Sequence, residues 1–331
     1  MAFRLKLVPD DTRIDFFRWQ FLTFGISTVL ALASIVVLFL NGLNFGIDFR
    51  GGTTIRTESV QPVNVAAYRA ALQPLNLGDV AITEVFDPTF GPEQNVAQVR
   101  ISAQDGTEAV TPQTVAAVEA ALQQVDPSIT FPSVESVGPK VSGELIQTAV
   151  YAVLASLVAI SIYIWLRFEW QFAVGAIVSL IHDVLITMGI FALFQIRFDL
   201  TTIAALLTIV GYSINDTVVV FDRLRENLMK YKTRALRDVM NLSVNETLSR
   251  TVMTSGTTLV ALIALLVLGG DVIRGFVFAI TFGILIGTYS SIYVAKNVVL
   301  WLGVKRDWDK ADPKDPKTRK NLSPFEGAEE G

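Results

Sequence analysis

Long apolar runs separated by polar stretches dominate the pattern of hydrophobic and polar positions along this chain. The first run extends from Trp19 to Leu40 without a charged residue, and about 20 such residues cross the hydrocarbon core of a bilayer as a helix. Five further runs reach a similar length, at about 147–166, 172–196, 200–221, 251–268 and 276–302. The pattern therefore predicts an α-helical membrane protein with six transmembrane helices and with both termini on one side.

The first and last runs need an interpretation beyond their length. The first is long for the apolar part of a signal peptide, and its exit Asn41-Gly-Leu-Asn44 lacks a small-residue cleavage site, so we interpret it as a retained membrane helix. The last contains Lys296, whose amine is expected to snorkel to an interface. We therefore expect its apolar core to end near Ala295.

The polar stretch 41–145 has the pattern of a small folded domain, and about 100 residues suffice for a core. Strand-like alternation occurs at 53–58, 80–86, 96–101 and 129–137, and helical spacing at 63–72 and 114–125. The order βαββαβ predicts a small α+β ferredoxin-like domain. That fold hosts many functions and implies none of them.

Composition supports the membrane interpretation and excludes several kinds of site. Hydrophobic residues make up 51% of the 331 residues, charged residues make up 18%, and the mean hydropathy is +0.48, which is high for a soluble domain. The absence of cysteine and the single histidine, His182, argue against disulfides and against thiolate or histidine metal sites. The net charge of −4 gives no basic field for nucleic acid.

Lysine and arginine lie mainly on one side of the predicted spans. Among the short connections on the opposite side, only Arg197 and Arg274 are basic. By the positive-inside rule, both termini are cytoplasmic and the α+β domain is periplasmic. The predicted organisation is an N-terminal segment 1–18, a first span 19–40, the domain 41–145, a bundle 146–302 with a helical, solvated cytoplasmic loop 222–250, and a disordered tail 303–331.

Asp216, preceded by Asn215, lies inside the fourth apolar run, where a carboxylate costs about 2.5–3.5 kcal/mol on insertion scales. At 1.5 Å per residue, Asp216 lies about 24 Å along its helix from Leu200. Arg250 begins the next run, about 28 Å from the corresponding boundary at Gly269. The similar depths predict that Asp216 and Arg250 meet within the membrane.

Two interpretations of these polar residues remain open. In the first, Arg250 is an interfacial anchor and Asp216 is a permanent ion-pair partner or a hydrogen-bonded neutral acid. In the second, Asp216 takes up and releases a proton. We favour the second interpretation because ionisable residues inside membranes usually have a functional role. Asp183, in the third run, either extends a proton path or hydrogen-bonds a neighbouring helix. We interpret the adjacent His182 as a packing residue.

The segment that follows the first span combines Asp48 and Arg50 with Gly51 and Gly52. The glycines permit positive φ and a tight chain reversal, and the two charges can pair. We interpret the segment as a turn that seats the periplasmic domain on the membrane. The sequence has no nucleotide-binding loop, metal cluster or nucleophile–base pair, so we expect neither enzymatic activity nor a cofactor.

Four stretches resemble the SecF family, at 45–53, 181–183, 211–227 and 246–258. SecF is the smaller half of a bacterial protein-export accessory complex related to the RND transporters. The resemblance spans nearly the whole chain and implies an RND-type half with six spans and one exported domain, in the bacterial inner membrane. It also implies that SecD, the SecYEG translocon, YajC and preprotein are partners, besides the lipid bilayer.

The resemblance implies that the proton motive force assists preprotein translocation. Asp216 matches the essential intramembrane acid of the family, and Arg250 matches the arginine of its Leu-Ser-Arg-Thr motif. Two alternatives stay open. One is a proton-coupled RND exporter of small molecules or lipids, and the other is a passive structural subunit of a membrane complex.

Overall fold

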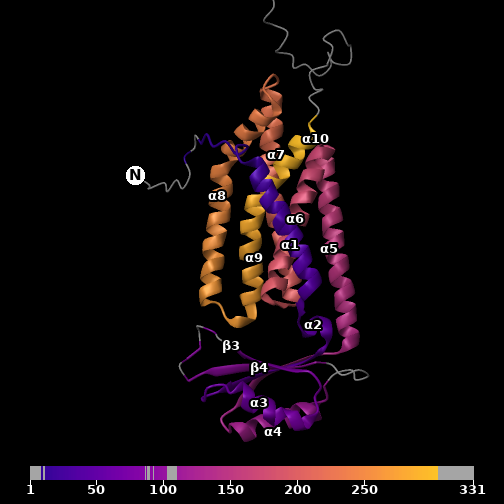
Figure 1. Ribbon diagram of the computed structural model, residues 1–331, viewed down its shortest axis with the longest axis vertical. Helices are drawn as coiled ribbons and strands as arrows, with labels where there is room; N and C mark the ends of the chain where they lie inside the picture. Colours follow the sequence, from indigo (N-terminus) through magenta and orange to yellow (C-terminus); the bar gives the residue numbers. More distant parts are fainter. Residues whose placement is uncertain are drawn as a thin grey trace, which may run out of the picture.

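The chain forms a bundle of long helices with a small α+β domain at one end (Figure 1). This computed structural model describes residues 9, 12–85, 87, 90–91, 93–102 and 110–304. The predicted disordered tail lies outside the described residues from position 305 onward.

Six helices of the described part are long and apolar enough to cross a membrane, in agreement with the six predicted spans. They are α1 (Gln20–Asn41), α5 (Pro139–Arg167), α6 (Trp170–Phe194), α7 (Leu200–Lys230), α8 (Leu236–Leu268) and α9 (Asp271–Ser290), which continues through a π-helical turn (Ser291–Ala295) into α10 (Lys296–Leu302). The helices α6, α7 and α9 are the most buried, whereas α1 and α5 expose most of their surface.

The helices α7 and α8 both extend beyond their apolar runs. The polar segment 222–250 therefore consists of the ends of these two helices and the short turn between them. An apolar stripe explains the extension of α7, because Phe221, Leu224 and Leu228 recur at helical spacing and are buried in one cluster with Val239 of α8. The two helix ends thus pack as a hairpin beyond the apolar spans.

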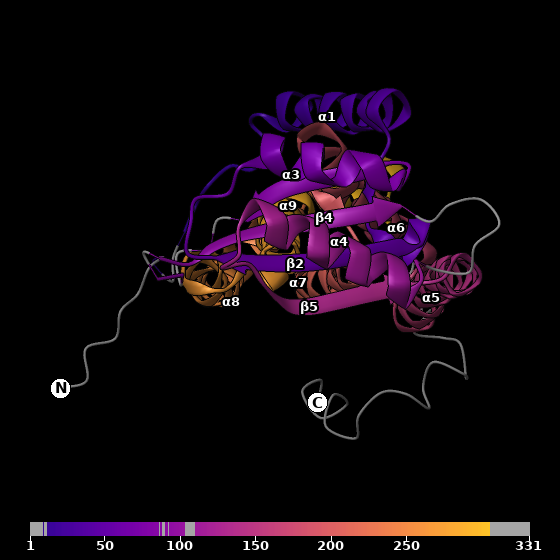
Figure 2. The same ribbon diagram turned by 90° about the horizontal axis from the view of Figure 1, so that it is seen from below.

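The small domain, which we call the sheet domain, contains one antiparallel sheet with strand order β3-β4-β2-β5. Its elements are β2 (Gly52–Ser59), α3 (Val65–Leu72), β3 (Val80–Val85), β4 (Asn95–Ser102), α4 (Pro112–Val125) and β5 (Thr130–Val137). This order confirms the predicted ferredoxin-like α+β fold. The sheet faces the bundle, and α3 and α4 cover its far face (Figures 1 and 2).

A compact junction connects the sheet domain to the bundle. It consists of the two-residue strand β1 (Asn44–Phe45), the short helix α2 (Ile47–Arg50) and the two-residue strand β6 (Arg197–Phe198), which pairs in parallel with β1. The side chains of Phe45, Phe49 and Phe198 form an aromatic cluster in this junction, with ring centroids 5.6–5.9 Å apart. Because β6 directly precedes α7, the junction joins the sheet domain to the helix that carries Asp216.

The prediction that Lys296 snorkels to an interface is wrong, because its side chain is only 1% exposed. Its Nζ donates a 3.1 Å hydrogen bond to the carbonyl of Phe16 and lies 3.9 Å from the centroid of the Phe17 ring. The described part of the N-terminal segment, residues 12–17, lies over the amine and supplies a carbonyl and aromatic faces, which stabilise a buried ammonium in place of water. The amine therefore does not need to reach the surface.

The N-terminal segment is held in place by two asparagines of α8. Asn245 accepts a 2.8 Å hydrogen bond from the amide of Ile14 and donates a 2.9 Å bond to its carbonyl. Asn241 accepts a 2.9 Å bond from the amide of Phe16. Residues four apart on a helix lie on one face, so the two amides bind the extended backbone side by side.

Candidate functional site

Asp216 is buried in the bundle, where its side chain points from α7 toward α8 and α9. It is 3% exposed, and one of its carboxylate oxygens accepts a long 3.4 Å hydrogen bond from the hydroxyl of Ser255 on α8. The Ser255 hydroxyl lies 2.8 Å from that of Thr288 on α9. Asp216 is therefore enclosed by protein and surrounded by few strong hydrogen-bond donors.

Arg250 does not form the expected ion pair with Asp216 in this conformation. It is exposed, and among the described residues no carboxylate lies within 4.0 Å of its guanidinium. Ser255 and Arg250 are five residues apart, which separates their directions by about 140° on a helix of 3.6 residues per turn. Because Ser255 faces Asp216, Arg250 is directed away, and its charge acts on Asp216 only at longer range.

Asp183 on α6 hydrogen-bonds two neighbouring helices. It is fully buried, and its Oδ2 accepts hydrogen bonds of 2.6 Å from Ser213 on α7 and 2.8 Å from Ser290 on α9. Its Oδ1 lies 2.9 Å from Nδ1 of His182. Of the two roles left open for Asp183, the hydrogen-bonding role is formed in this structure.

His182 is only partly satisfied as a packing residue. Its Nδ1 contacts Asp183, whereas its Nε2 is buried and has no hydrogen-bond partner within the described part of the chain. Because its Nε2 makes no hydrogen bond there, His182 differs from a core histidine whose two ring nitrogens are both hydrogen-bonded.

The hydrogen-bonded groups around the two carboxylates are neighbours, and together we call them the buried polar layer. It is formed by Asp183, Ser213, Asp216, Ser255, Ser290 and the half-buried Thr288. Ser213 and Asp216 are three residues apart, so they share one face of α7. Gly287 permits the close approach of α9, because a Cβ there would lie 3.1 Å from Cβ of Ser213 and 3.5 Å from Oδ2 of Asp183.

Asn215, the neighbour of Asp216, lies on the exposed face of α7 and is not part of the buried polar layer. Consecutive residues on a helix point about 100° apart, so the burial of Asp216 directs Asn215 outward. A role for Asn215 in proton coupling stays a prediction.

The predicted turn after the first span has the expected backbone but different partners. Gly51 and Gly52 have positive φ values of 70° and 126°. Asp48 forms no ion pair with the exposed Arg50; its Oδ2 instead accepts a 3.0 Å hydrogen bond from the amide of Leu200, the first residue of α7. A carboxylate at a helix N-terminus complements the positive end of the helix dipole.

Sequence reasoning missed the hydroxyl side chains of the layer. Ser213, Ser255, Thr288 and Ser290 all lie within apolar runs, and single hydroxyls are common in such helices. The spacing of Ser213 from Asp216 was the one available signal. The described residues contain no group of three or more potential metal ligands.

Three features define the class of this polytopic membrane protein. A six-helix bundle carries a ferredoxin-like domain, and it encloses carboxylates on adjacent spans. The family of protein export membrane proteins SecD/SecF, C-terminal, matches residues 117–305, and the SecD/SecF GG motif matches residues 36–63. The chain belongs to the SecF family of protein translocase subunits, which act in protein export and are not enzymes.

Relatives support this assignment over nearly the full length. SecF of Cereibacter sphaeroides is 70% identical and covers 95% of this chain and 97% of its own. SecF of Rhodobacter capsulatus is 63% identical and covers 95% and 96%. The crystal structure of SecDF from Thermus thermophilus has a TM-score of 0.80 and 38% identity, and the match covers 89% of this chain and 39% of that chain.

Proposed function

We propose that this chain works with a SecD partner and uses the proton motive force to assist preprotein translocation, through protonation of Asp216. Association with SecD is supported by fused relatives. SecDF of Brucella abortus matches 97% of this chain over 41% of its own length, at 42% identity. The part of such a fused relative that lies outside the match supplies the SecD half of the complex.

The burial of Asp216 without a strong hydrogen-bond partner carries this proposal. A carboxylate at this depth costs about 2.5–3.5 kcal/mol on insertion scales, and the 3.4 Å contact with Ser255 offsets little of that cost. Neutralisation by a proton removes the cost and also the attraction to Arg250. The packing of α7 against α8 therefore depends on the protonation state of Asp216.

The two buried acids have separate roles in this mechanism. Asp183 is saturated by hydroxyl donors from α7 and α9 and by His182, so it fixes the three helices to one another. Asp216 is the group that changes its protonation state. One charge that crosses 100 mV provides about 2.3 kcal/mol, which biases a two-state element whose states differ by a few kcal/mol.

The orientation in this proposal places both termini in the cytoplasm and the sheet domain in the periplasm, as the distribution of basic residues predicts. SecYEG, YajC and preprotein are the further partners that membership of the SecF family suggests. Movement of α7 reaches the sheet domain through β6 and Asp48.

The substitution Asp216→Asn tests the proposal because it preserves the volume of the side chain and removes its titration. Proteoliposomes that contain this chain, SecD and SecYEG are assayed for preprotein translocation and proton flux with and without a proton gradient. We expect the gradient-dependent stimulation to be lost. Asp222→Asn is the matched control, because Asp222 lies on the same helix and pairs with Arg167 at the exposed end.

Full stimulation by the Asp216→Asn protein would refute the mechanism. Proton flux that requires no preprotein would favour a small-molecule or lipid exporter. The absence of both flux and stimulation in the wild type would favour a passive subunit.

A further inference from the structure

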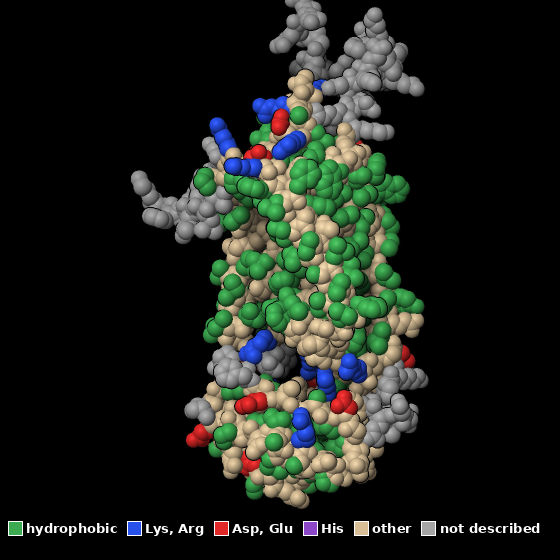
Figure 3. All heavy atoms as spheres, viewed as in Figure 1, with side chains coloured by type: hydrophobic (Ala, Val, Ile, Leu, Met, Phe, Trp, Pro, Cys, Tyr) green, Lys and Arg blue, Asp and Glu red, His purple; other side chains and the backbone are tan. Residues whose placement is uncertain are grey.

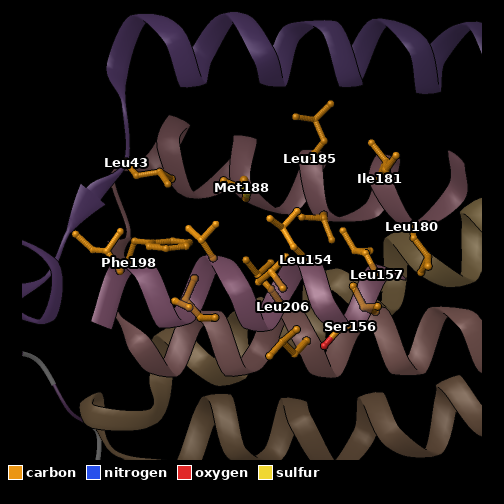
Figure 4. Close-up of a pocket in the computed structure, with 18 of the residues that line it drawn as sticks. Leu43, Leu154, Ser156, Leu157, Leu180, Ile181, Leu185, Met188, Phe198 and Leu206 are labelled. Atoms are coloured by element: carbon orange, nitrogen blue, oxygen red, sulfur yellow. The ribbon is translucent and has the colours of Figure 1, made fainter. Parts of the chain in front are cut away.

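A cavity of about 670 Å³ lies between α5, α6 and α7 (Figure 4). Its wall is apolar except for Ser156. Apolar side chains of α5, such as Leu154 and Leu157, point toward Leu206 of α7 and the facing residues of α6 (Figure 4). A cavity without polar partners does not hold water.

The cavity lies beside the middle of α5, because this helix is fully buried only near its two ends. Ser142 and Ile164 are the two buried residues among the described side chains of this helix. The hydroxyl of Ser142 donates a 3.4 Å hydrogen bond to the carbonyl of Ile47 in the junction. Between these contacts, residues such as Val150 and Leu154 are about half exposed, so the cavity opens toward the bilayer.

The depth of the cavity matches one leaflet. On α5 its wall extends from Ile146 to Leu157, a rise of about 17 Å, against about 30 Å for the whole hydrocarbon core. One end is formed by the junction residues Phe45 and Phe198, and beyond the other end Ile164 returns to the bundle. A transmembrane helix would have to cross both leaflets, whereas a lipid chain occupies one.

Three arginines lie at the junction end of this cavity. Arg50 belongs to α2 and Arg197 to β6, the two junction elements that also supply Phe49 and Phe198 to the cavity wall. Arg100 of β4 donates a 3.5 Å hydrogen bond from Nη1 to the carbonyl of Phe45, and the charges of Arg50 and Arg197 act on its guanidinium. Basic side chains gather at the boundary between the bundle and the sheet domain (Figure 3).

The positive charge of these arginines is only partly balanced. Burial, followed by the charges of Arg197 and Arg50, lowers the pKa of the Arg100 guanidinium, and Asp79 opposes the shift. Arg197 lies 3.7 Å from Asp199, and its buried Nε has no hydrogen-bond partner among the described residues. An anionic group at this position would relieve the repulsion among the three guanidinium groups.

We propose that this site binds one anionic phospholipid from the leaflet on the side of the sheet domain. One acyl chain fills the cavity, and the phosphate binds the cluster of Arg50, Arg100 and Arg197. Guanidinium groups suit phosphate because their fork of N–H donors matches its oxygens. The lipid contacts the junction, so its binding holds the sheet domain against the bundle. This inference does not depend on proton transfer at Asp216.

The test uses the full chain, purified with its SecD partner in mild detergent and titrated with phosphatidylglycerol under native mass spectrometry. We expect one tightly bound lipid per chain. Val153→Phe fills the cavity and should weaken binding about tenfold by displacing the acyl chain. Arg50→Gln removes an exposed charge from the cluster and should also weaken binding about tenfold, since a charge-assisted hydrogen bond contributes about 1.5–3 kcal/mol. Val158→Phe, on the part of α5 outside the cavity wall, and Arg69→Gln, on the sheet domain, are the matched controls.

The proposal is overturned if wild-type protein binds no phosphatidylglycerol, or if Val153→Phe and Arg50→Gln bind it as tightly as their controls. It is also overturned if the lipid binds the chain alone and is displaced by SecD, because a partner helix would then occupy the cavity. If Val153→Phe loses binding and Arg50→Gln does not, the cavity binds an acyl chain but the arginine cluster does not bind the phosphate.

Discussion

Asp183 and Asp216 are both buried carboxylates on neighbouring helices, but their hydrogen bonds differ. Asp183 accepts two short bonds from hydroxyls and contacts His182, whereas Asp216 has a single 3.4 Å contact. An unmet buried acceptor costs free energy, and a saturated one contributes to stability. At the scale of the residue, the hydrogen bonds of Asp183 stabilise the bundle, whereas Asp216 is the acid to which the proposed function assigns the change of protonation state.

This difference predicts opposite sensitivities to amide substitution. We expect Asp183→Asn to lower the free energy of unfolding by about 1.5–3 kcal/mol, because the hydrogen bonds from Ser213 and Ser290 lose their charge assistance and an amide N–H replaces the oxygen that faces His182. Asp216→Asn should instead stabilise the protein, because the neutral amide removes the cost of a poorly hydrogen-bonded buried carboxylate. Thermal unfolding of the purified chain in detergent, followed by tryptophan fluorescence, measures both; equal destabilisation of the two variants would contradict the assignment.

At the scale of the element, residues 12–17 of the N-terminal segment are docked against α8 and α10. Asn241 and Asn245 of α8 bind the backbone of this segment, and Lys296 of α10 donates a hydrogen bond to the carbonyl of Phe16. The π-helical turn directly before Lys296 lies between that residue and Ser290 of the buried polar layer. Such turns are frequent at functional sites in helices.

The substitution Lys296→Met tests this docking because it keeps the apolar stem and removes the amine. A desolvated cation–π contact contributes about 2 kcal/mol, so we expect hydrogen exchange at the amides of Ile14 and Phe16 to accelerate tenfold or more. Exchange in α6 serves as the internal control. Unchanged protection at both amides would show that the two asparagines alone hold the segment.

At the scale of the whole molecule, the junction is the route between the sheet domain and the bundle. Asp48 binds the first amide of α7, and β1 pairs with β6 immediately before that helix. The same helix carries Asp216 to the buried polar layer. No long flexible linker therefore separates α7 from the sheet domain, and the proposed function uses this connection to transmit a displacement of α7.

The substitution Asp48→Ala removes one side chain from this route. Loss of a hydrogen bond to a charged group costs about 1.5–3 kcal/mol, so we expect a wider distribution of distances between spin labels on α4 and on α8, measured by pulsed electron paramagnetic resonance. Arg69→Gln on the sheet domain is the control. An unchanged distribution would mean that the paired strands alone fix the sheet domain.

The sequence by itself determined the features that depend on local pattern. Apolar runs predicted the six spans, and alternation of apolar and polar residues predicted the sheet domain. The rise per residue predicted how far Asp216 lies along its helix from Leu200. These properties follow from geometry along one element, which the order of residues specifies directly.

The tertiary structure decided which side chains meet. Ser255 faces Asp216 while Arg250 turns away, Lys296 is buried under Phe16, and Asp48 binds α7 instead of Arg50. Depth is a property of one helix, whereas the rotation of each helix about its axis is set by packing against its neighbours. That rotation depends on contacts between residues far apart in the chain, which no local pattern encodes.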